Sequence, residues 1–102
     1  MPRNLDFTDE AAGDLAAMRR WYSQPGAGAA AKRRAQAIVD AIERLRDMPC
    51  LPARGRRPGT REFTAQGHRI IYRVDPDTDS NTTAGDVLVL RVFGPGQDRS
   101  AL

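Results

Sequence analysis

The sequence lacks the residues from which disulfides, metal centres and membrane spans are built. Its 102 residues contain one cysteine, Cys50, and one histidine, His68. One thiol excludes an intrachain disulfide and a multi-cysteine metal site, and is typical of a reducing compartment. No apolar run approaches the ~20 residues of a membrane span, and no signal peptide is visible. We therefore expect a cytoplasmic protein that forms one domain over residues 1–102, with no metal ion, cofactor or membrane partner.

Sequence motifs for catalysis are also missing. There is no Gly-x-Ser-x-Gly, no P-loop and no dinucleotide-binding fingerprint. Cys50 has only His68 as a possible imidazole partner, and a lone histidine beside a hairpin turn is usually an exposed polar residue. Asp75, Asp77 and Asp79 alternate as in a calcium loop, but the glycine and distal glutamate of such a loop are absent. We assign no catalytic residue.

The charge balance is modestly basic. Sixteen lysines and arginines against thirteen acidic residues give a net charge of +3 and a pI of about 9.7. This surplus suits a polyanion or an acidic protein partner, and by itself it decides between neither.

The first half of the chain predicts two helices. Thr8 is the expected N-cap of a helix that ends near Gln24, with apolar residues at helical spacing at Ala11, Leu15, Met18 and Tyr22. Residues 27–47 form a second amphipathic helix with an alanine-rich start. The short Pro-Gly connection between them requires antiparallel neighbours, so the two apolar stripes form one surface.

The second half of the chain predicts strands. A short first strand is expected at residues 4–7, and residues 58–74 form two strands joined at Gln66-Gly67. Side chains alternate in a strand, so one face carries Ile70, Tyr72 and Val74 and the other carries Arg69, Ile71 and Arg73. Residues 86–93 are apolar on both faces, which indicates a central strand. Apart from Asp86 at its start, its one charged residue is Arg91, which is assigned to the arginine face.

Two segments are predicted as loops. Residues 48–59 hold three arginines and are either a solvated connector, the interpretation we favour, or a loop that contacts anions. Residues 75–85 are polar, acidic and rich in turn formers, and are expected to be mobile. The elements together predict an α+β fold in which an N-terminal helical hairpin packs on one face of a small antiparallel β-sheet.

Five motifs follow one another along the chain: Phe-Thr-Asp-Glu-Ala-Ala-Gly-Asp-Leu, Ile-Glu-Arg-Leu-Arg-Asp-Met-Pro, Pro-Gly-Thr-Arg-Glu-Phe, His-Arg-Ile-Ile-Tyr-Arg-Val and Val-Leu-Arg-Val-Phe. In this order they resemble the RelE/ParE toxin superfamily of type II toxin–antitoxin modules. The resemblance implies the fold above and an acidic, partly disordered antitoxin, typically of the ribbon-helix-helix type, that wraps the toxin.

The superfamily has two functional branches, and the residues favour the ParE branch. The RelE branch cleaves messenger RNA in the ribosome with cations on the second and third strands, a later arginine and a C-terminal tyrosine. Here Arg69 fits the third-strand arginine, but Thr60 and Glu62 replace the second-strand lysines and Gln97 replaces the later arginine. No tyrosine follows Tyr72. The ParE branch, which shares the Pro-Gly-Thr-Arg-Glu segment, implies a toxin that binds DNA gyrase without chemistry of its own.

Two sets of residues are predicted to bind partners. Met18, Trp21 and Tyr22 are the expected antitoxin contacts, with Trp21 either an exposed anchor or a partly buried core residue. The expected target surface comprises Arg61, Arg69, Arg73, Arg91, Gln97, Asp98 and Arg99.

Alternative hypotheses remain for this surface. The arginines pair with Glu62, Asp86 or Asp98 and hold the sheet together, or they act as a rearranged cluster in a ribosome-dependent RNase. A degenerate, non-toxic protein that only binds antitoxin is the third functional possibility. Direct DNA binding by the chain alone is not expected.

Overall fold

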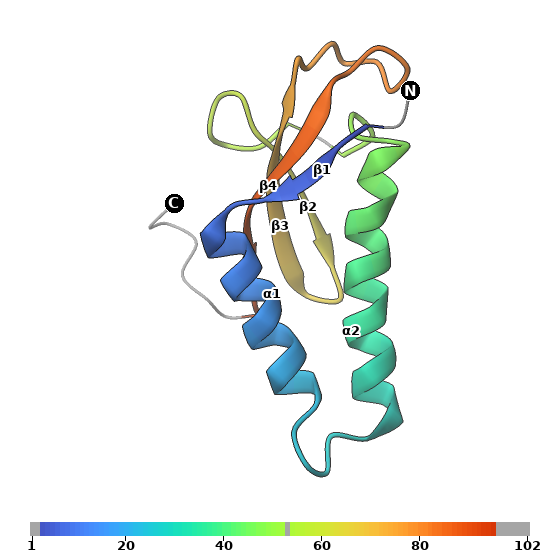
Figure 1. Cartoon of the computed structure of the whole chain (residues 1–102), viewed down its shortest axis with the longest axis vertical. Helices are drawn as coiled ribbons and strands as arrows, with labels where there is room; N and C mark the ends of the chain where they lie inside the picture. Colours follow the sequence, from blue (N-terminus) through green and yellow to red (C-terminus); the bar gives the residue numbers. More distant parts are fainter. Residues whose placement is uncertain (1–2, 53, 96–102) are drawn as a thin grey trace.

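The computed structural model describes residues 3–52 and 54–95. The elements are β1 (Leu5–Phe7), α1 (Asp9–Tyr22), α2 (Gly28–Glu43), a 3₁₀ turn (Arg44–Arg46), β2 (Arg61–Ala65), β3 (His68–Asp75) and β4 (Asp86–Phe93). Figure 1 shows the two helices side by side and antiparallel, as the short connection predicts. No helix within the described residues has the length and apolar character needed to cross a bilayer.

The predicted helix boundaries are confirmed at the start of α1 and shortened in α2. The backbone N–H of Ala11 donates to the side-chain oxygen of Thr8 at 3.1 Å, so Thr8 is the N-cap. The α-helical geometry of α2 ends at Glu43 and tightens into the 3₁₀ turn, and Pro49 follows as a fully buried residue.

The four strands form one mixed sheet in the order β1-β4-β3-β2. The antiparallel pairing expected for the sheet holds for β2–β3 and β3–β4, whereas β1 pairs parallel to β4. Gln66 and Gly67 both have positive φ, at 51° and 79°, which is the geometry of a two-residue hairpin turn between β2 and β3. The β4 strand lies inside the sheet, as its two apolar faces predict.

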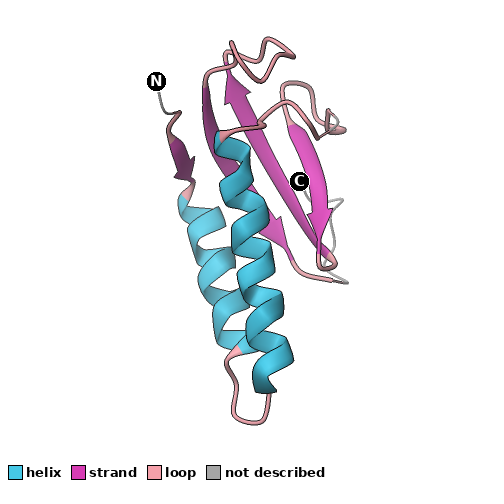
Figure 2. Cartoon of the chain, turned by 90° about the vertical axis from the view of Figure 1, so that its right-hand side faces the viewer, coloured by secondary structure: helices cyan, strands magenta, loops and turns pink. Residues whose placement is uncertain are grey.

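The core lies between the helices and one face of the sheet, which Figure 2 shows as two layers. The buried apolar residues include Met18, Tyr22, Ile38, Ile42, Ile70, Tyr72, Val74, Val87, Val89 and Val92. The side assigned to Ile70, Tyr72 and Val74 from alternation is therefore the helix-covered side. Arg69 and Arg73 face away from the helices.

A β-bulge in β4 decides where Arg91 points. Tyr72 pairs with Val89, but the preceding Ile71 pairs with Arg91, which leaves Leu90 as the extra residue. Strict alternation would place Arg91 on the same face as Val87 and Val89. The extra residue reverses the alternation, so Arg91 joins the arginine face opposite the helices.

Candidate protein-binding surfaces

Arg61 is a structural residue on the helix-covered side of the sheet. Arg61 is 4% exposed, and it lies directly opposite the core residue Tyr72 of the neighbouring strand β3. Its guanidinium donates to Asp77 at 2.7 and 3.0 Å, to Asp79 at 2.5 Å, and to the carbonyls of Cys50 and Pro52 at 3.2 and 2.8 Å. The prediction that Arg61 belongs to an exposed target surface is therefore wrong in this structure.

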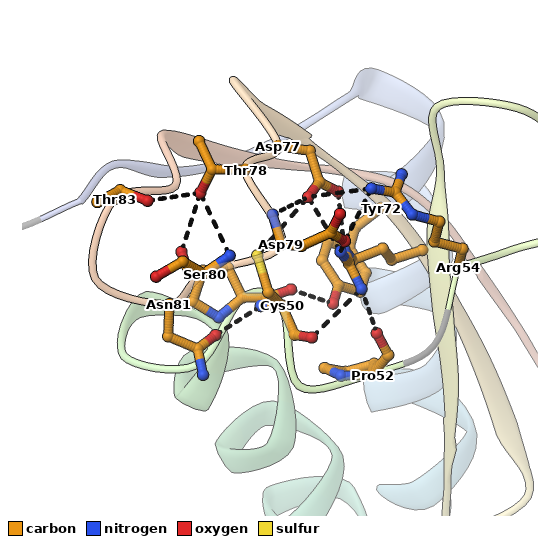
Figure 3. Close-up of polar contacts among 12 residues, drawn as sticks. Cys50, Pro52, Arg54, Tyr72, Asp77, Thr78, Asp79, Ser80, Asn81 and Thr83 are labelled. Atoms are coloured by element: carbon orange, nitrogen blue, oxygen red, sulfur yellow. Dashed lines mark hydrogen bonds and ion pairs between the residues drawn. The ribbon is translucent and has the colours of Figure 1, made fainter.

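The partners of Arg61 come from two loops, and Figure 3 shows Asp77 and Asp79 close to Cys50 and Pro52. Asp77 and Asp79 belong to the loop of residues 75–85, and Cys50 and Pro52 belong to the loop after the helices. Arg54 donates to Asp79 at 2.8 Å and closes the cluster. We call this group the Arg61 cluster: Cys50, Pro52, Arg54, Arg61, Asp77 and Asp79.

The electrostatics of the Arg61 cluster follow from these contacts. The Arg61 hydrogen bonds lower the pKa of Asp77 to about 2, against the smaller opposing effect of burial. Burial and the neighbouring Asp77 carboxylate raise the pKa of the Cys50 thiol. A raised pKa keeps Cys50 protonated and weakens it as a nucleophile. Two of the three alternating aspartates, Asp77 and Asp79, thus accept hydrogen bonds from guanidinium groups.

The loop of residues 75–85, which the sequence predicts to be mobile, is folded onto itself by backbone hydrogen bonds in this structure. The backbone N–H of Gly85 donates to the carbonyl of Pro76 at 2.8 Å, and that of Ala84 donates to Ser80 at 2.9 Å. A Cβ at Gly85 would lie 2.0 Å from the carbonyl oxygen of Asp75, so only glycine permits this closure. Asn81 accepts the Cys50 N–H at 2.7 Å and attaches the loop to its neighbour.

The sheet face opposite the helices carries three of the predicted target residues. Arg69 forms a two-bond ion pair with Glu62, one bond of which is 2.9 Å. Arg91 lies 4.6 Å from the Phe93 ring centre and donates to Asp14 of α1 at 2.8 and 3.2 Å. Arg73 is exposed, and none of the described residues forms an ion pair with it.

The pairing hypothesis is correct for Arg69, because Glu62 is its partner. Asp14, the partner of Arg91, was missed because it lies 77 residues away in the sequence. Its carboxylate also accepts the backbone N–H of Val92 at 2.9 Å, beyond the end of short β1, and so covers part of an open strand edge. The remaining predicted target residues, Gln97, Asp98 and Arg99, lie outside the described residues.

The three predicted antitoxin contacts line one groove between α1 and the end of β4. The groove has a volume of about 530 Å³ and is bordered by Asp14, Ala17, Met18, Trp21, Tyr22, Arg34, His68, Val92, Gly94 and Pro95. Met18 and Tyr22 are buried in its floor, whereas Trp21 is 64% exposed. The structure therefore favours the exposed-anchor alternative for Trp21.

His68 lies in the floor of this groove and is not the exposed residue expected from its place beside the turn. It is 5% exposed, and its Nε2 lies 2.8 Å from the Tyr22 hydroxyl. Burial and the positive charge of Arg34 lower its pKa, so the neutral imidazole predominates at neutral pH. The first position of β3 faces the core, which the alternation with Ile70 would have indicated.

Comparison with known proteins identifies the family. Residues 5–98 match the model of the family described as ParE toxin of type II toxin-antitoxin system, parDE. The chain belongs to the ParE toxin family.

Solved structures agree with this assignment at the level of the fold. The ParE-family chain is similar to a chain of the chromosomal ParDE toxin–antitoxin system from P. aeruginosa, with a TM-score of 0.67 and 23% identity over 91% of this chain and 96% of the other. It is also similar to a chain of the toxin–antitoxin complex RelBE2 from Mycobacterium tuberculosis, with a TM-score of 0.60 and 24% identity over 92% and 99%. No curated protein matches the sequence significantly. The predicted superfamily and α+β fold are confirmed.

Proposed function

We propose that this ParE-family toxin acts by binding a protein target, DNA gyrase, through the sheet face opposite its helices, and that it cleaves no RNA itself. The observation that carries this proposal is the ion pair between Glu62 and Arg69. Arg69 is the residue that fits the third-strand arginine of the nuclease branch. Here its guanidinium is already bound to a carboxylate on the neighbouring strand.

The electrostatics of this pair oppose phosphoryl chemistry. A nuclease site needs uncompensated positive charge where the phosphate develops negative charge in the transition state. Glu62 neutralises Arg69 and would repel a phosphate at the same place. Thr60, at the other lysine position, is buried and donates its hydroxyl to the Arg57 carbonyl at 2.6 Å. Neither position supplies a cation to RNA.

The same face suits a protein partner. Arg73 offers an exposed guanidinium, and Arg91 is held over the Phe93 ring by the Asp14 carboxylate. Paired charges beside aromatic and aliphatic side chains fix the orientation of a protein contact. The proposed target surface is therefore Arg69, Arg73 and Arg91, with Gln97, Asp98 and Arg99 kept from the sequence prediction.

The groove at Trp21 is the proposed antitoxin site. Its apolar floor of Met18 and Tyr22 and its exposed indole suit a helix that inserts bulky apolar side chains. Arg34 at the rim suits an acidic antitoxin. We place toxin, antitoxin and target in the cytoplasm as part of this proposal.

Induced expression of the chain without an antitoxin tests the toxin function. We expect growth arrest and, with purified protein, inhibition of gyrase-dependent DNA supercoiling. Arg69→Glu and Arg91→Glu are expected to relieve both, whereas Arg56→Glu, an exposed arginine in the loop after the helices, serves as the control. Ribosome-dependent cleavage of messenger RNA in a purified translation system would support the RNase hypothesis instead. Normal growth with abundant folded protein would indicate the degenerate, non-toxic alternative.

A further inference from the structure

The positive charge of this chain is concentrated in one segment. Residues 15–39 contain five basic residues and no acidic residue, which gives this segment a charge of +5. The rest of the chain has eleven basic and thirteen acidic residues, a charge of −2. The net charge of +3 is therefore the sum of a strongly asymmetric charge distribution along the chain. The five residues are Arg19, Arg20, Lys32, Arg33 and Arg34, which we call the basic tip.

The fold brings these residues together at one end of the helical hairpin. Arg19 and Arg20 are in the last turn of α1, and the other three are in the first turns of α2, which runs antiparallel to it. Arg19 and Lys32 border one shallow groove of about 250 Å³ between the helices. Figure 1 shows this end of the hairpin extending past the sheet.

The basic tip has no acidic partner within the described residues. All five side chains are exposed, and none of them forms an ion pair there. By contrast, Arg61, Arg69 and Arg91 each have a carboxylate partner. Gathering like charges without counter-charges raises their mutual repulsion, and a bound polyanion relieves it.

We infer that the basic tip binds the phosphate backbone of nucleic acid. Phosphates repeat along a nucleic-acid strand, and exposed cations bind them without a shaped pocket. The end of the helical hairpin presents such exposed cations. The residues between the two basic runs are mostly small and exposed, from Ser23 to Ala30, so a backbone approaches the tip closely. The apolar groove that suits a peptide helix lies to one side, at Trp21 and Met18, and shares only Arg34, at its rim, with the basic tip.

This inference goes beyond gyrase binding and does not depend on it. It also departs from the sequence-based expectation that the chain alone binds no DNA. The net charge of +3, which by itself does not decide between a polyanion and an acidic protein partner, averages a +5 segment with an acidic remainder. Local charge, rather than net charge, determines the electrostatic attraction within a Debye length of about 10 Å.

Fluorescence anisotropy with the purified chain tests the inference. The probes are a labelled 30-base-pair DNA duplex and a labelled 30-nucleotide single-stranded RNA, each titrated from about 50 to 200 mM salt. Contacts to about three phosphates give a slope of log K against log salt of about −2.7, so affinity for the duplex should decrease about 40-fold over this range. Equal affinity for both probes would indicate general phosphate recognition. A higher affinity for one probe would indicate whether DNA or RNA is the preferred ligand.

The decisive variant is Arg19→Gln/Arg33→Gln. Its matched control is Arg44→Gln/Arg56→Gln, which removes two exposed arginines without ion pairs elsewhere in the described structure. We expect the first variant to weaken binding at least 10-fold and to reduce the salt slope, and the control to change affinity less than 3-fold.

Two results would overturn the inference. One is an equal loss in both variants, since net charge alone would then explain binding. The other is displacement of wild-type chain from the DNA duplex by polyglutamate at equal charge concentration, which would point to an acidic protein partner. Circular dichroism confirms that each variant is folded. Because gyrase is absent from the assay, the result is independent of the proposed target.

Discussion

Arg61 and Arg69 lie on adjacent strands of one β-hairpin, yet Arg61 is a buried structural residue and Arg69 is a surface residue. Arg61 faces the helices, is 4% exposed and joins two loops through Asp77 and Asp79. Arg69 faces away, is partly exposed and pairs with Glu62 on the surface of the sheet. The difference shows that the face on which a strand arginine lies, together with its partners, decides whether it is a structural residue or a surface residue. The residue type alone does not decide this.

The largest expected effect is on stability, from Arg61→Ala. This change leaves the Asp77 carboxylate with a 3.8 Å contact to Arg54 as its remaining ion pair among the described residues, and it removes the Arg61 donor from two loop carbonyls. It should lower the free energy of unfolding by about 3 kcal/mol. Urea denaturation followed by circular dichroism measures it. Arg73→Ala, exposed and unpaired in the described structure, is the control and should cost less than about 0.5 kcal/mol. Similar losses in both variants would contradict the comparison.

The next effect is the acid sensitivity of the Arg61 cluster. Since the folded pKa of Asp77 is about 2, below its usual value, this carboxylate stabilises the fold above about pH 4. The contribution of about 2 kcal/mol should be lost as the pH decreases from about 4 to 2. Denaturation at several pH values should show a smaller loss in Asp77→Asn. An unchanged acid profile in that variant would exclude Asp77 as the source.

The third prediction separates structure from binding at Arg69. Arg69→Glu should raise the concentration that inhibits supercoiling at least about 10-fold, equivalent to about 1.4 kcal/mol of target affinity. Adding Glu62→Arg restores an ion pair with the charges exchanged. We expect this double variant to recover wild-type unfolding free energy but not inhibition. Recovery of both would mean that Arg69 serves only to hold the strands together.

The smallest predicted effect concerns His68. This residue precedes Arg69 in the sequence and lies on the helix-covered face of the sheet. Tyr22→Phe removes its hydrogen-bond partner and should cost about 1 kcal/mol. Because burial lowers the pKa of folded His68, the unfolded chain binds the proton first, so stability should decrease as the pH falls below about 6.5. His68→Gln should reduce that pH dependence. If the slope between pH 7 and 5 is the same in the variant, another group is responsible.

Much of the fold was predictable because it follows from local patterns. Thr8 before an acidic first turn predicts the start of α1, and Gln66-Gly67 between alternating residues predicts the hairpin. The antitoxin groove was predictable in part. Trp21 falls beside the apolar stripe, but His68 and Pro95 reach the same groove only through the pairing of β3 with β4 and the packing of α1.

The features that escaped prediction depend on contacts between distant residues. Arg61 meets Asp77 across 16 residues, and Arg91 meets Asp14 across 77. The sequence around Asp77 and Asp79 does not indicate which arginine side chains these aspartates bind. The bulge at Leu90 is equally hidden, since an unbroken apolar alternation predicts no extra residue.

The sequence by itself determined the helical hairpin, the β-hairpin turn, the central strand and the family. These depend on periodicity, capping and turn chemistry, which act over a few residues. Only the tertiary structure decided that Arg61 is buried, that Arg91 pairs with Asp14 and that five cations share one end of the hairpin. The reason is that burial, ion pairing and charge clustering are properties of packed elements, and packing joins residues that the sequence keeps apart.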